Sequence, residues 1–142
     1  MKVLFISIFL LTLSYSAHSR ADIAVIVNND NDISALTLSE LKRIYTGKVS
    51  QFSNGVPIHL SDLSKKDPIR DSFYKRATGK STKKMIAYWR ERLFSGEGIP
   101  PKENRSAARM KFWVSDQQGA IGYVDASEID TSVKTVLVIK QP

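Results

Sequence analysis

The sequence predicts an α/β domain with one central sheet and about four flanking helices. Short β-branched runs alternate along the chain with segments in which apolar residues recur every three or four positions, as expected for strands and helices in turn. The chain has 142 residues. About 120 of them remain once an N-terminal targeting segment is set aside, which is the size of one ordinary domain.

Residues 1–21 have the layout of a secretory signal peptide. A positive start precedes an almost wholly apolar run over residues 3–13, and small and polar residues follow up to Ala21. That run is too short to cross a bilayer as a helix. We therefore expect cleavage after Ser19 or Ala21, and a periplasmic or secreted mature domain over residues 22–142 that does not span a membrane.

The first half of this domain predicts two strands and a helix. Residues 22–28 are nearly continuous in β-branched and apolar side chains, as in a buried strand. Thr37 followed by Glu40 forms a capping box that predicts a helix start, and Gly47 predicts its end. A second strand is expected over residues 56–60.

The second half predicts three more helices and two strands. The helices are expected over residues 67–78, 82–95 and 104–116, with Asn104 as the N-cap of the last one. The strands are expected over residues 120–124 and 133–139. Within the second of these helices, Met85, Trp89 and Leu93 are spaced by four, which predicts that they face the core.

Positive charge is concentrated in the middle of the chain. The formal net charge is +7, and residues 65–111 hold 14 Lys and Arg against 5 Asp and Glu. For an exported protein, nucleic acid is not an expected partner, whereas a phosphate-bearing solute, an anionic lipid surface or an acidic protein face fits this charge. A solvated cationic surface without a partner is the alternative. The residues expected to face a partner are Lys75, Arg76, Lys83 and Lys84.

The sequence does not predict an enzyme, a cofactor or a metal site. The mature chain has His59 as its only histidine and contains no cysteine, and the common nucleophile and phosphate-loop motifs are absent. A weaker interpretation is an enzyme that uses His59 with Asp62. Residues 28–32 resemble the start of a calcium loop, but Ile33 stands where that loop needs glycine.

The segment 61–76 is the candidate anion site. A strand leads into a polar turn and a helix start, where free backbone N–H groups attract anions. The alternative is a capped surface turn, in which Asp67 itself accepts hydrogen bonds at the helix start. The candidate anion ligands are three hydroxyls and one guanidinium, from Ser61, Ser64, Ser72 and Arg70.

Several segments, in this order, resemble the phosphate-type periplasmic substrate-binding proteins of ABC transporters, and in particular their short single-lobe relatives. The segments are Ile23-Ala-Val-Ile-Val-Asn28, Thr37-Leu-Ser-Glu-Leu-Lys-Arg-Ile-Tyr-Thr-Gly-Lys-Val49, Phe52, Val56-Pro-Ile-His-Leu-Ser61 and Gly119-Ala-Ile-Gly-Tyr-Val-Asp125. This resemblance implies a single three-layer lobe of the type 2 periplasmic-binding-protein fold, with a mixed central sheet. It also implies phosphate or similar anion binding, linked to phosphate ABC transport.

The chain departs from that family in two respects. It has the length of one lobe, so a second copy or another envelope protein would have to close the site around an anion. The family holds phosphate with an Arg before a Ser-Gly-Thr at a helix start, and here that helix start is Asp67-Pro68-Ile69. The alternative function is therefore a non-transport envelope interaction protein that uses the same lobe and its basic residues to bind an acidic partner or surface.

Overall fold

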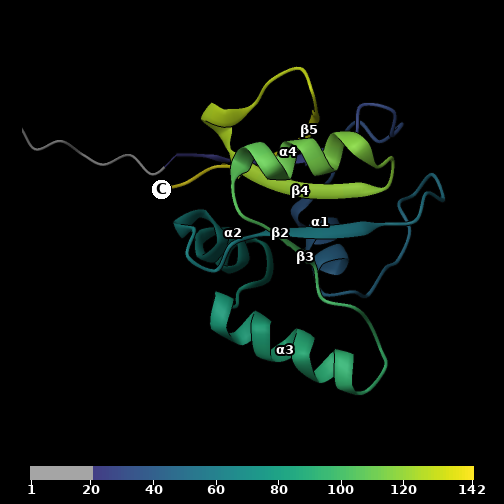
Figure 1. Cartoon of the computed structure of the whole chain (residues 1–142), viewed down its shortest axis with the longest axis vertical. Helices are drawn as coiled ribbons and strands as arrows, with labels where there is room; N and C mark the ends of the chain where they lie inside the picture. The colour runs from purple at the N-terminus through teal and green to yellow at the C-terminus, as the bar shows by residue number, and fades with distance from the viewer. Residues whose placement is uncertain (1–20) are drawn as a thin grey trace, which may run out of the picture.

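The computed structural model describes residues 21–142, so the predicted signal peptide lies outside the described residues except for Ala21. The described chain is an α/β domain with a mixed five-stranded sheet in the order β3-β2-β4-β1-β5, which confirms the predicted fold class (Figure 1). Its elements are β1 (Ile23–Val27), α1 (Leu38–Tyr45), β2 (His59–Leu63), α2 (Pro68–Thr78), α3 (Thr82–Phe94), β3 (Lys102–Asn104), α4 (Ala107–Asp116), β4 (Ala120–Asp125), the 3₁₀ turn η1 (Ala126–Glu128) and β5 (Lys134–Ile139).

Three of the strands run parallel and therefore end at the same edge of the sheet. β2 pairs in parallel with β3 on one side and with β4 on the other, whereas β1 is antiparallel to β4 and to β5. The register places Leu63 opposite Asn104 at the ends of β2 and β3. We call the residues that follow these two strands, 64–67 and 105–106, the carboxyl edge.

Helices cover both faces of the sheet, and one helix stands apart. α4 packs on β4, β1 and β2, while α2 packs on the opposite face together with α1. α3 packs mainly against α2 and lies away from the sheet (Figure 1). Much of its surface is therefore exposed.

Aromatic side chains fill the space between α1, α2 and the sheet. The rings of Phe73 and Tyr123 are stacked, with centroids 3.7 Å apart and planes 6° from parallel. Tyr45 meets Phe73 edge-on at 4.7 Å, and its hydroxyl donates to the carbonyl of Ser61 at 2.9 Å. Each of these three aromatic side chains is fully buried. They form the centre of the core on this face.

The two glycines of the Gly-Ala-Ile-Gly-Tyr segment are required by close packing. A Cβ atom at Gly119 would overlap the carbonyl oxygen of Pro57. A Cβ atom at Gly122 would overlap the sulfur of Met110 and lie 2.8 Å from the hydroxyl of Ser61. This motif therefore has a structural role, bringing β2 and α4 close to β4.

The ends of α1 are as predicted. The hydroxyl of Thr37 accepts from the backbone N–H of Glu40 at 3.2 Å, and the Glu40 carboxylate accepts from the backbone N–H of Thr37 at 2.7 Å, which completes the capping box. Gly47 follows the helix with a positive φ of 68°. A Cβ atom there would lie 2.8 Å from the Trp89 ring, so glycine is needed for both conformation and space.

Two predicted boundaries were wrong, and one strand was not predicted. β2 covers 59–63 instead of 56–60, so Ser61 and Asp62 belong to a strand and not to a turn. β3 was not predicted, because none of its three residues is apolar and pairing with β2 holds it in place. Asn104 ends β3, and the N-cap of α4 is Ser106, whose hydroxyl accepts from the backbone N–H of Arg109 at 3.2 Å.

The predicted inward stripe of α3 is only partly correct. Met85 and Trp89 are buried, but Leu93 is 52% exposed. α3 packs mainly against α2, and Leu93 lies in the last turn of the helix, beyond its buried part. Leu93 is therefore a surface residue.

Candidate anion-binding edge

The start of α2, where the family motif would place an anion, is filled by the protein's own carboxylate. Asp67 is the N-cap, and its side chain accepts from the backbone N–H of Ile69 at 3.0 Å. Pro68 occupies the first helical position and has no N–H to donate. An anion at this helix start would therefore meet a negative charge and few free donors.

Ser61 is inside the sheet and is not accessible to an anion. Its exposed fraction is 0%. The hydroxyl donates to the carbonyl of Ile121 at 3.1 Å and lies 2.6 Å from the sulfur of Met110. The three-residue shift of β2 explains this position, because it moves Ser61 from the expected turn into the strand.

Arg70 lies on the inner face of α2 and is almost completely buried. One guanidinium nitrogen pairs with the carboxylate of Asp62 at 3.0 Å. The other donates to the carbonyl of Leu63 and pairs with Glu103, each at 3.0 Å. The charge of Arg70 is therefore already balanced by two carboxylates of the same chain.

The buried carboxylate of Asp62 is the centre of a polar cluster that sequence reasoning missed. It accepts from the hydroxyl of Tyr74 at 2.5 Å and from that of Tyr123, in addition to its pair with Arg70. Burial raises the pKa of Asp62, while Arg70 and the two hydroxyls act in the opposite direction. Burial raises the pKa of Tyr74 and of Tyr123 well above the ordinary tyrosine value, and the negative charge of Asp62 adds to this effect. The two hydroxyls therefore remain protonated donors.

A signal for this cluster was present in the sequence. Arg70, Phe73, Tyr74 and Ala77 are spaced as i, i+3, i+4 and i+7, which is the pattern of one helix face, and all four are buried. We call Asp62, Arg70, Tyr74 and Tyr123 the Asp62–Arg70 cluster.

The remaining two predicted ligands lie at different places. Ser64 is half-buried at the carboxyl edge, where its backbone N–H donates to the carbonyl of Asn104 at 3.0 Å. Ser72 lines a hollow on the outer side of α2, next to Gln141 and Pro142. The structure therefore does not bring Ser61, Ser64, Arg70 and Ser72 together into one site.

What the carboxyl edge does present is a group of exposed cations. Lys66 follows β2 and Arg105 follows β3, and both are exposed and take part in no ion pair within residues 21–142. The Ser64–Asn104 hydrogen bond holds the two turns side by side. Ser106 adds a hydroxyl at the start of α4. Hydroxyls, guanidinium and ammonium groups are the donors that phosphate-class anions prefer.

The four residues of the predicted basic block fall into two separate pairs. On α2, Lys75 pairs with Asp71 at 2.6 Å, and Arg76 donates to the carbonyl of Lys140 at 2.6 Å. Lys83 and Lys84 are exposed in the first turn of α3.

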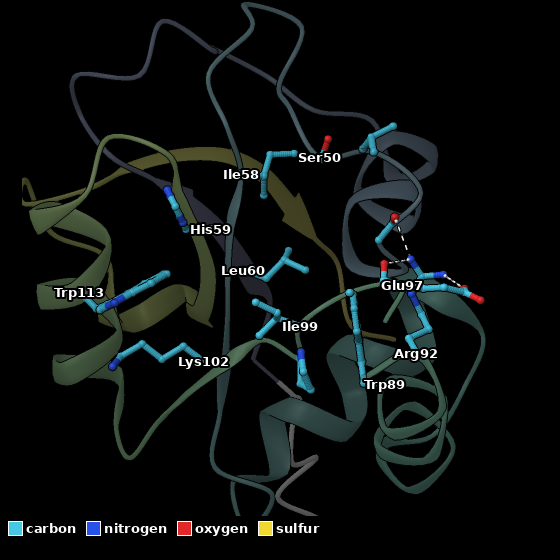
Figure 2. A pocket seen from close by; sticks show the side chains of 14 residues that line it. Ser50, Ile58, His59, Leu60, Trp89, Arg92, Glu97, Ile99, Lys102 and Trp113 are labelled. Atoms are coloured by element: carbon cyan, nitrogen blue, oxygen red, sulfur yellow. Dashed lines mark hydrogen bonds and ion pairs between the residues drawn. The ribbon is translucent and has the colours of Figure 1, made fainter. Parts of the chain in front are cut away.

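A hollow of about 410 Å³ lies at the other end of β2, far along the strand from the carboxyl edge. Figure 2 shows Trp89 and Arg92 on one side of β2 and His59 and Trp113 on the other. His59 and Asp62 are three residues apart on one strand, so they point to opposite faces, and Asp62 is buried. The enzyme interpretation that pairs them is therefore wrong.

Within residues 21–142, no group of three His, Cys, Asp or Glu side chains is arranged to hold a metal ion. In the same part of the chain, no helix combines the length and the apolar character needed to cross a membrane.

Comparison with solved structures finds phosphate-binding proteins of transporters. One is a protein assigned as a phosphate ABC transporter substrate-binding protein, with bound phosphate, from Clostridium perfringens, with 25% identity and a TM-score of 0.67. Another is an ABC-type phosphate transport receptor from Vibrio cholerae, with 22% identity and a TM-score of 0.65. The matches cover 82% and 83% of this chain but 45% and 47% of those proteins, so the chain spans about half their length.

No sequence among curated proteins matches the chain. The model of the PBP superfamily domain matches residues 17–139, which is most of the chain. The predicted resemblance to a short single-lobe relative of the phosphate-type substrate-binding proteins is thereby confirmed. The chain belongs to the family that this model describes, the PBP superfamily domain.

Proposed function

We propose that this chain is an exported, solute-binding-like domain that binds a phosphate-class anion at its carboxyl edge and serves phosphate uptake. The observation that carries the proposal is that Lys66 and Arg105 lie in the turns that follow two paired parallel strands, turns that the Ser64–Asn104 hydrogen bond joins. Ligands of open α/β sheets bind at this end of the strands. The bound phosphate in the Clostridium perfringens relative supports the same class of ligand.

The expected affinity of the isolated domain is low. A pair of unit charges 4 Å apart in water gains about 1 kcal/mol. The carboxyl edge offers a few such pairs, and Asp67 opposes them from the start of α2. Two cations and a phosphate of about two negative charges form about four such pairs, so the upper limit is about 4 kcal/mol, which corresponds to a dissociation constant near 1 mM.

Tight binding therefore requires a second surface that excludes water from the edge, because charge attraction grows as the local dielectric constant falls. Lys66 and Arg105 are exposed in this domain, and a second copy or another envelope protein would supply such a cover. The interaction-protein alternative differs in one testable respect, because it does not require phosphate.

The test is calorimetric titration of the domain with inorganic phosphate at a constant ionic strength of about 30 mM, where screening is weaker than at physiological salt. We expect saturable one-site binding that the double variant Lys66→Gln/Arg105→Gln abolishes. A matched control, Arg43→Gln/Lys48→Gln, removes two exposed cations elsewhere and should keep binding.

The variant Asp67→Ser provides an independent check. Serine keeps a helix-capping oxygen but removes the charge that opposes the anion, so phosphate affinity should rise severalfold. If the wild-type domain and Asp67→Ser both fail to bind at about 10 mM phosphate, far above the expected dissociation constant, the anion proposal is overturned.

Export is tested separately, by mass spectrometry of the mature protein from a periplasmic fraction. Cleavage after Ser19 would leave Arg20 as the first residue, and cleavage after Ala21 would leave Asp22. A protein that still begins at Met1 would contradict the predicted signal peptide.

A further inference from the structure

A continuous groove runs along one side of α3. Two adjoining hollows, of about 560 and 400 Å³, share Lys65, Ile86 and Arg90 in their walls. The first hollow extends towards Lys83 at the start of α3, and the second towards Leu93 at its end. We call this combined hollow the α3 groove. The 13 residues of α3 give it a length of about 20 Å.

The uncompensated charge in the α3 groove is positive. Lys65, Lys83 and Arg90 are exposed, and none of them forms an ion pair in the described part of the chain. The acidic side chains on the groove wall are already paired with cations of the same chain, although Arg70 shares its single charge between two carboxylates, and the three free cations outweigh the remaining negative charge. Asp71 pairs with Lys75 at 2.6 Å, and Glu103 pairs with Arg70 at 3.0 Å, as Asp62 does.

Apolar surface lies between these cations. Leu93 is 52% exposed, and Ile86, Pro100 and Pro101 are half-buried in the groove wall. Phe94, one turn beyond Arg90, is 86% exposed. Exposed apolar side chains that are grouped and bordered by charge are typical of surfaces that bind other proteins.

We propose that the α3 groove binds an acidic, amphipathic segment of another protein. Carboxylates of the segment would face Lys83, Lys65 and Arg90, and its apolar residues would cover Ile86 and Leu93. The length of the groove matches about 14 residues of helix.

Two other occupants fit less well. A flat lipid surface would touch the rims of a concave groove and leave its wall uncovered. A second copy of the mature domain would bring another molecule of net positive charge against a positive face. The proposal also does not depend on anion binding, because the proposed anion ligands, Lys66 and Arg105, do not line the groove.

The test uses a fluorescein-labelled helical peptide of about 14 residues, with leucines every three or four positions and glutamates between them. A control peptide carries lysine in place of every glutamate. Fluorescence anisotropy with the full mature domain at low salt should show saturable binding of the acidic peptide, and none of the basic one. Raising the salt to about 0.3 M should weaken binding severalfold.

Variants locate the binding surface. Lys83→Glu/Arg90→Glu should weaken binding about tenfold or more, because each attraction becomes a repulsion. Leu93→Ala should weaken it about threefold. The matched control Arg43→Glu/Lys48→Glu has the same change in net charge away from the groove, and its affinity should stay within about twofold of the wild type.

The proposal is overturned if the acidic peptide does not saturate, or if the control variant loses affinity as much as the groove variant. It is also overturned if the groove variant specifically loses binding to phosphatidylglycerol vesicles, or specifically loses self-association, while peptide binding is unchanged. Phosphate titration of Lys83→Glu/Arg90→Glu separates the two proposals. Neither residue lies at the carboxyl edge, so this variant should lose peptide binding and keep phosphate binding.

Discussion

Replacing Arg70 by methionine tests whether the Asp62–Arg70 cluster is a buried ion pair on which the fold depends. Arg70→Met keeps most of the side-chain volume but leaves the carboxylate of Asp62 in the core without its cation. Removing one partner of a buried pair costs about 3–5 kcal/mol. The hydroxyls of Tyr74 and Tyr123 still donate to Asp62, so we expect a loss near the lower end, about 3 kcal/mol at pH 7.

The sign of the pH dependence follows from the pKa of Asp62. Burial already raises this pKa, and removal of Arg70 raises it further. The folded state of Arg70→Met then binds a proton at Asp62 more readily than the unfolded state does. The stability of the variant therefore falls as pH rises through the pKa of Asp62 in the folded state. It increases on acidification towards 3.8, the ordinary pKa of an aspartate. The loss should therefore shrink between pH 7 and pH 5, by at most about 1.4 kcal/mol per pH unit.

The assay is urea unfolding followed by the fluorescence of Trp89 and Trp113. The double variant Arg70→Met/Asp62→Asn removes the unpaired charge and keeps an acceptor for the tyrosines, so it should recover about 2 kcal/mol of the loss. Lys75→Met breaks an exposed ion pair and serves as a control, with a loss below about 0.5 kcal/mol. A loss below about 1 kcal/mol for Arg70→Met, or no recovery in the double variant, would refute this reasoning.

Three further predictions concern the fold. Gly119→Ala should destabilise the domain more than Gly122→Ala in urea unfolding, because the added Cβ at position 119 meets a backbone carbonyl. The sulfur next to Gly122 belongs to a flexible side chain, so the expected loss for Gly122→Ala is about 1–3 kcal/mol. Glu40→Gln should lower stability at pH 7 by about 0.5 kcal/mol. Backbone and side-chain hydrogen bonds from Thr37 lower the pKa of Glu40 in the folded state. The stability difference between wild type and Glu40→Gln should therefore vanish as pH falls below 4.5 and through the folded pKa. Paired unfolding curves from pH 7 to pH 3 measure it. Leu93→Ser should change stability by less than about 0.5 kcal/mol, whereas Met85→Ala should cost about 2–5 kcal/mol in the same assay.

Elements with local signals were predictable from the sequence. The capping box of Thr37 and Glu40 needs only neighbouring residues, and it marks the start of α1 in the structure. Asp67 and Pro68 mark the start of α2 in the same way. Continuous β-branched residues identify β1, because its burial on both faces demands apolar side chains at every position.

The elements that were missed depend on distant partners. Ser61 and Asp62 look like turn residues because they are polar, yet their partners for burial lie 12 and about 60 residues further along the chain. β3 is a strand only because β2 lies beside it. No local pattern encodes these contacts of β2, so the strand was placed three residues too early and Ser61, which is buried, was included among the candidate anion ligands.

The same reasoning explains why likeness to the family predicts the lobe better than its ligand. Tyr45 and Tyr123, both motif residues, use their hydroxyls inside the core, and Gly119 and Gly122 allow close packing. These residues would be needed in any lobe of this shape, whatever it binds.

The ligand, in contrast, depends on a few side chains at the carboxyl edge, and there this chain has its own arrangement. Asp67 stands at the helix start, and Arg70 is balanced by Asp62 and Glu103. Under the proposed function, an anion would be held by the outer cations Lys66 and Arg105, which water screens until another surface covers them. Affinity for phosphate in this domain should therefore depend on its partner far more than on its own helix dipole.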